Sequence, residues 1–103
     1  MKDLLEYSAS KEEIETVTKA INENGYWESS TEFRMSTYMT ARIEKKIKNG
    51  KPWFITTVNC EQEIMIPAKT IERAIVFKNI YEDFQFDLIN RIGWASWSSK
   101  NKP

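Results

Sequence analysis

The chain contains no histidine and only one cysteine, Cys60, in 103 residues. Histidine is the commonest general base and a frequent zinc ligand, so its absence argues against the usual catalytic triads and most zinc sites. A single cysteine cannot form an internal disulfide, which is typical of a protein in a reducing compartment. Without a histidine to raise its thiolate fraction, Cys60 is interpreted as a small turn or core residue.

Glycine is also scarce, and Gly25, Gly50 and Gly93 lie far apart. A phosphate-binding loop needs clustered glycines, so each of the three is interpreted as a turn or a helix stop. No apolar run approaches the roughly 18 residues that a membrane-spanning helix needs, and the first residues contain no signal-peptide core. We therefore expect a cytoplasmic protein with no membrane association and no cofactor.

What the chain does have is enough apolar material for a core, with 41% hydrophobic and 13% aromatic residues. Its length suits one domain. We predict a single small α+β domain over residues 1–103, with residues 98–103 as a frayed tail. The expected order is α-β-β-β-α: an N-terminal helix, a three-stranded antiparallel meander, and a C-terminal helix or helix pair.

The N-terminal helix is predicted over residues 11–24. Ser10 and Glu13 have the spacing of a capping box, in which each side chain bonds the other residue's backbone amide. Val17 and Ile21 belong to an apolar face with helical spacing, and Gly25 provides the stop.

Residues 33–48 fit both a strand, with alternating apolar positions, and a helix, with an apolar residue at every fourth position. Six Ser and Thr between residues 29 and 40 favour the strand, and Asn49-Gly50 is a strong hairpin signal. A two-residue loop there would pair residue 48 with 51, 46 with 53, 44 with 55 and 42 with 57.

The rest of the meander and the C-terminal helical region follow this hairpin. Residues 53–58 are aromatic and β-branched, and residues 64–66 are predicted as a third strand that ends at Pro67. A helical region is expected from Pro67, with a break near Asn79 and a stop at Gly93. This order resembles that of double-stranded-RNA-binding domains, but the histidine-bearing loop and the lysine cluster of that family are absent, so no functional residues are assigned from it.

Charge is balanced in sum, with 15 basic and 15 acidic residues, but not in layout. Residues 1–32 hold three bases and eight acids, whereas residues 33–51 hold six bases and one acid. On the predicted hairpin, the basic and aromatic side chains of this segment share an outward face. That face could hold phosphates and stack bases, or it could anchor a protein. The alternative is that Lys46 simply lies over Trp53 as a cation–π pair on a solvated sheet.

Four tryptophans are many for so short a chain, and Trp97, in a polar tail, is the one we expect to be exposed. The acidic groups at residues 12–15 and 82–87 are explained by the helix dipole and give no catalytic arrangement. The candidate partner-binding residues are Arg34, Tyr38, Arg42, Lys46, Lys48, Lys51, Trp53 and Trp97.

Three hypotheses follow. The first is a small non-enzymatic protein that binds a macromolecular partner and inhibits or stabilises it, as immunity proteins, antitoxins and phage anti-defence proteins do. The second is a nucleic-acid-binding module that uses the basic and aromatic face of residues 34–53, although the chain has no overall basic excess. An enzyme is the least favoured. We expect a protein partner, with nucleic acid or a second copy of the chain as alternatives.

Overall fold

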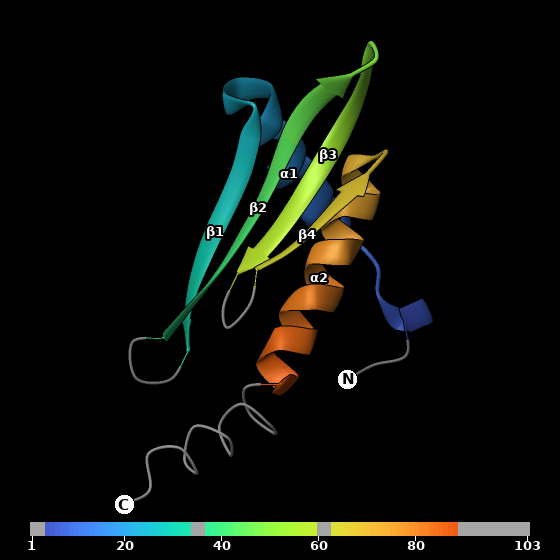
Figure 1. Cartoon of the computed structure of the whole chain (residues 1–103). Coiled ribbons are helices and arrows are strands. Elements are labelled where there is room, and N and C mark those ends of the chain that lie inside the picture. The colour runs from blue at the N-terminus through green and yellow to red at the C-terminus, as the bar shows by residue number, and fades with distance from the viewer. Residues whose placement is uncertain (1–3, 34–36, 60–62, 89–103) are drawn as a thin grey trace, which may run out of the picture.

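One antiparallel sheet and two α-helices form the fold of the residues that the structure describes, 4–33, 37–59 and 63–88 of a computed structural model. The sheet has the strand order β1-β2-β3-β4, so each strand pairs with its neighbour in sequence (Figure 1). This confirms a small α+β domain with a helix at each end. In chain order the elements are a short 3₁₀ helix η1 (Leu4–Glu6), α1 (Lys11–Asn24), β1 (Tyr26–Phe33), β2 (Thr37–Lys48), β3 (Lys51–Asn59), β4 (Glu63–Ala68) and α2 (Ile71–Leu88).

The sheet has four strands, and the prediction of three was wrong. The additional strand is β1, which follows α1 directly and pairs with β2 from Tyr26 opposite Glu44 to Phe33 opposite Thr37. Its sequence has no apolar alternation, because Trp27 is followed on the same face by Ser29 and Thr31. Pairing with β2 therefore stabilises β1, whose own sequence pattern does not specify a strand. With this strand the chain has the order α-β-β-β-β-α, which differs from the α-β-β-β-α order of double-stranded-RNA-binding domains.

The prediction for α1 is confirmed, including both ends. Ser10 Oγ accepts a hydrogen bond from the Glu13 amide at 3.0 Å, and Glu13 Oε1 accepts one from the Ser10 amide at 3.0 Å. The two bonds satisfy amides that the first helical turn leaves without partners. Gly25 ends the helix with a positive φ of 85°, a conformation that glycine adopts without steric penalty.

The β2–β3 hairpin is confirmed with the predicted register. Lys48 pairs with Lys51, and Lys46 pairs with Trp53. Asn49 and Gly50 have φ angles of 54° and 73°, as a tight two-residue turn with positive φ at both central positions requires. This turn fixes which β2 and β3 side chains share a face.

The C-terminal helix α2 runs through Asn79 without interruption, so the break predicted near Asn79 was wrong. Asn79 lies inside it, and its side-chain amide donates to the Ser8 carbonyl at 3.2 Å and to Glu13 Oε2 at 3.3 Å. These bonds outweigh the weak helix preference of asparagine. The helix also begins later than predicted, because β4 continues through Pro67 and the Thr70 side chain accepts from the Arg73 amide at 3.1 Å.

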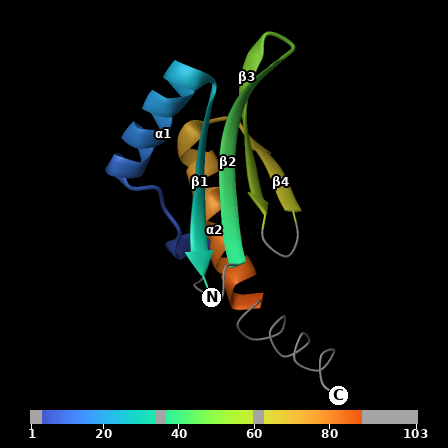
Figure 2. The ribbon, with the colours of Figure 1, turned by 90° about the vertical axis from the view of Figure 1, so that its left-hand side faces the viewer.

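Both helices pack on the same face of the sheet. Val17 and Ile21 of α1 join Ala74 and Ile75 of α2 in one buried cluster with Ile43 and Ala68 from the strands, and Met39, Ala41 and Val58 form a second cluster. Figure 2 shows α1 to one side of β1 and β2. Two polar bonds fix α2 to β3: Thr56 Oγ1 donates to the Ala74 carbonyl at 2.9 Å, and Gln85 Nε2 donates to the Val58 carbonyl at 3.2 Å.

The opposite face of the sheet is left without a helix over it in the described part of the chain. None of the described helices is long and apolar enough to cross a membrane.

Candidate binding surface

The face of the sheet turned away from the helices is called the outer face here. Strand side chains alternate between faces, so the register places every second residue of each strand on it. Glu28, Arg42, Thr57 and Met65 form one row across the four strands, and Tyr26, Glu44, Ile55 and Pro67 form the next.

Large apolar side chains of the outer face are open to solvent. Met65 is 60% exposed and Tyr38 is 53% exposed, whereas Ile55 is half-buried. Aromatic residues and methionine are enriched at protein interfaces, because they bury much area and adapt to a partner's shape. The outer face thus has the composition of a docking surface.

Arg42, at the centre of the outer face, is held by two carboxylates and a ring. Its guanidinium donates to Glu28 Oε2 at 3.0 Å and to Glu44 Oε2 at 3.4 Å, and lies 3.9 Å from the centre of the Tyr26 ring. Desolvation opposes the charge, but the bonds to the two glutamates outweigh it and raise the pKa of Arg42 above its ordinary value. Arg42 is therefore a neutralised cation and is poorly suited to binding a phosphate.

The end of the β2–β3 hairpin differs from the centre. Residues 45–53, called the hairpin tip here, include the exposed lysines Lys45, Lys46, Lys48 and Lys51. Lys46 lies 3.6 Å from Glu44 Oε1, whereas the other three form no ion pair with any described residue. The hairpin tip is the part of the predicted basic surface where positive charge remains available.

The predicted site residues thus divide between two places. Arg42 lies at the centre of the outer face with Tyr38 near the start of β2, where it pairs with Glu32 of β1 alone, and the hairpin tip contains Lys46, Lys48, Lys51 and Trp53. Trp53 is half-buried, and the cation over its ring is Lys69, with Nζ 5.9 Å from the ring centre, instead of the expected Lys46. Arg34 and Trp97 lie outside the described residues.

Sequence reasoning missed the part of the outer face that β1 and β4 contribute. Tyr26 and Glu28 were not placed there because β1 was not predicted. Met65 and Pro67 belong to β4, and a period-two count continued through Pro67 would have placed both on one face.

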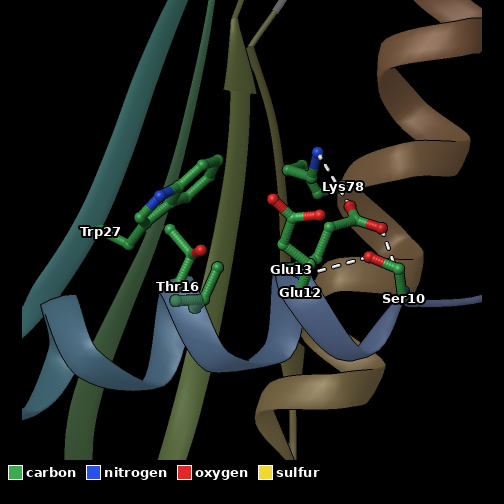
Figure 3. A pocket seen from close by; sticks show the side chains of 7 residues that line it. Ser10, Glu12, Glu13, Thr16, Trp27 and Lys78 are labelled. Atoms are coloured by element: carbon green, nitrogen blue, oxygen red, sulfur yellow. Dashed lines mark hydrogen bonds and ion pairs between the residues drawn. The ribbon is translucent and has the colours of Figure 1, made fainter.

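A small pocket lies on the helix side of the sheet, between α1, β1 and α2 (Figure 3). It encloses about 220 Å³ and is lined by Ser10, Glu12, Glu13, Thr16, Val17, Trp27 and Lys78. Lys78 is largely buried, with Nζ 3.0 Å from Glu82 Oε1, 3.7 Å from Glu13 Oε2 and 5.6 Å from the centre of the Trp27 ring. Its charge is satisfied by these neighbours, and it connects three elements of the fold.

Glu13 contributes to that connection as well as to the helix cap. Burial alone would raise its pKa, but the hydrogen bonds from Ser10 and Asn79 and the charge of Lys78 hold the pKa of Glu13 below its ordinary value. Among the described residues, acidic side chains do not gather into a group able to hold a metal ion, and Cys60 lies outside the described residues.

Comparison with known proteins gives no assignment: no family model matches the chain, and no curated protein or solved structure matches it. The function is therefore inferred from the geometry of the outer face and the hairpin tip.

Proposed function

We propose that this chain is a non-enzymatic binding protein that docks another protein on the outer face of its sheet and thereby inhibits or stabilises it. The observation that supports this most directly is the outer face itself, which has exposed apolar and aromatic side chains and no described helix over it. Exposed methionine and aromatic side chains are enriched at protein interfaces.

The charge pattern favours a protein over a nucleic acid at the centre of this face. Glu28, Glu32, Glu44 and Glu63 are outer-face residues by register, and two of them already neutralise Arg42. These carboxylates would repel the phosphates of a nucleic acid, whereas mixed charge among exposed apolar side chains suits a protein partner. A partner with apolar residues framed by both signs of charge would complement it.

The test is affinity capture from the native host with the whole chain and two variants. Met65→Lys places a charge in the outer face at an exposed position and should abolish recovery of a stoichiometric protein partner. Phe84→Ser removes an exposed apolar side chain of α2 and is the matched control, so it should recover that partner normally.

Recovery of no stoichiometric partner by the parent chain, or equal recovery by both variants, would contradict the proposal. If the partner is a second copy of the chain, sedimentation will show a dimer that Met65→Lys dissociates.

A further inference from the structure

We propose that the hairpin tip binds the phosphate backbone of a DNA duplex, with the β2–β3 ribbon entering the major groove. This goes beyond the proposed function, because it concerns the far end of the β2–β3 hairpin instead of the centre of the outer face, and a different class of partner. Three features of residues 45–53 support it: their projection from the sheet, their charge on both faces, and an exposed apolar pair.

The hairpin tip projects because its neighbouring strands stop short. Pairing with β1 ends at Glu44, and pairing with β4 ends at Phe54, so from Lys46 to Trp53 the ribbon has no strand beside it (Figure 1). The three residues from Lys46 to Lys48 extend by roughly 10 Å at the usual rise of a strand. The major groove of B-DNA is about 12 Å wide and 8.5 Å deep and admits a two-stranded ribbon.

Lysines of the hairpin tip lie on both faces of this ribbon. Lys46, Lys48 and Lys51 belong to the outer face, and Lys45 belongs to the opposite face by register. A groove presents phosphates along both of its walls, so cations on both faces of an inserted ribbon can meet them. The nearest carboxylate in the register, Glu44, accepts a bond from Arg42 and lies 3.6 Å from Lys46 Nζ, so Lys45, Lys48 and Lys51 are the tip lysines that form no ion pair with a described residue.

An apolar pair completes the hairpin tip. Ile47 pairs across the ribbon with Pro52, and Ile47 is 65% exposed. In the major groove such a pair can contact thymine methyl groups. The only aromatic residue in the hairpin tip is Trp53, which is half-buried with Lys69 over its ring. The ribbon therefore lacks the row of exposed aromatic rings on which the bases of single-stranded nucleic acid stack.

The acidic groups at the other end of the molecule would orient the approach. Asp83 of α2 and Glu6 of η1 lie around one polar hollow, and Figure 1 shows η1 and the C-terminal half of α2 far from the hairpin tip. A polyanion repels that end and attracts the tip, so the chain can bind DNA without a net positive charge.

The test is fluorescence anisotropy with a labelled 20-base-pair DNA duplex across a salt series. With about three phosphate contacts, from the three lysines of the tip that form no ion pair, the logarithm of the binding constant should fall with the logarithm of salt with a slope of roughly −2.7, which is about a 40-fold loss between 50 and 200 mM. Lys48→Gln/Lys51→Gln should reduce the slope to about −1 and weaken binding at 50 mM at least tenfold. Lys48→Arg/Lys51→Arg should retain binding, which separates charge from a structural role.

The matched control is Lys11→Gln/Lys19→Gln, which removes the same charge from exposed positions of α1 and should leave the slope unchanged. Equal loss in both glutamine variants, or a slope near zero, would overturn the proposal. So would equally tight binding of a single strand of the same length or of polyglutamate, which would assign the tip to another polyanion. Met65→Lys should not weaken DNA binding, so failure here is distinguishable from failure of the proposed protein interface.

Discussion

The centre of the outer face and the hairpin tip both carry basic residues of the β2–β3 hairpin. At the centre the cation is ion-paired, whereas at the tip most of the cations are not. At the centre, Arg42 is enclosed by Glu28, Glu44 and the Tyr26 ring, and the core lies directly beneath. At the tip, Lys48 and Lys51 face each other with no described carboxylate paired to either, and no helix supports them. The difference shows that a run of basic residues in sequence does not make one basic surface. Residues on the neighbouring strands form ion pairs with some of the cations and leave the others able to bind a partner.

The largest expected effect contrasts two isoleucines on the same face of β2. Ile43 is fully buried under both helices, whereas Ile47 is 65% exposed in the hairpin tip. Ile43→Ala should lower the free energy of unfolding by about 2–5 kcal/mol because it leaves a cavity in the core. Ile47→Ala should change it by less than about 0.5 kcal/mol, as surface substitutions usually do. Urea unfolding of the two variants would measure both values, and equal losses would show that the tip is packed.

A smaller effect is expected at the turn that shapes the tip. Gly50→Ala forces a side chain into a left-handed conformation and should cost about 1–2 kcal/mol. Asn49→Gly is the control, because glycine accepts the positive φ at that position. Thermal unfolding would compare them, and an unchanged midpoint for Gly50→Ala would argue against the tight turn.

These residues also show what could be predicted from sequence. The α1 boundaries and the hairpin register were predictable because capping residues, a stop glycine and the Asn49-Gly50 turn act locally. The β1 strand was not, since its segment has no alternating apolar pattern and depends on β2 for pairing. Likewise, a glutamine at position 85 does not suggest burial, yet Gln85 is fully buried and bonded to the Val58 carbonyl.

The candidate site was predictable only in part for the same reason. Outward positions on β2 followed from the period of two, so Tyr38, Arg42, Lys46 and Lys48 were placed correctly. Their neighbours depend on strands far away in sequence. Glu28 on β1 neutralises Arg42, and Lys69 beyond β4 covers Trp53.

A third, weaker effect compares a paired cation with an unpaired one. Arg42→Met should lower the thermal midpoint, because it leaves Glu28 and Glu44 close together without the cation between them. Lys48→Met should leave the midpoint unchanged. The Arg42 effect should shrink in 1 M salt, since exposed charges are screened there. Calorimetry at low and high salt would check this, and equal shifts for the two variants would contradict the described pairing.

The smallest effect concerns Glu13 and pH. Its folded-state pKa is lowered, so the ionised form stabilises the fold above the unfolded pKa of roughly 4.3, and this contribution is lost as pH falls through the lower folded-state value. Glu13→Gln should be less stable than the parent at pH 6 and approach it as the pH falls below about 4. Urea midpoints across this range would measure the difference, and a difference that is constant with pH would contradict the role of the charge.

A nitrogen-15 NMR titration of the full chain with the DNA duplex tests most directly whether the hairpin tip binds DNA separately from the centre of the outer face. The amide shifts of residues 45–53 and of Lys69 should change, while those of Tyr26, Arg42 and Met65 should stay in place. Changes centred on these last three residues, or no changes at all, would contradict this prediction.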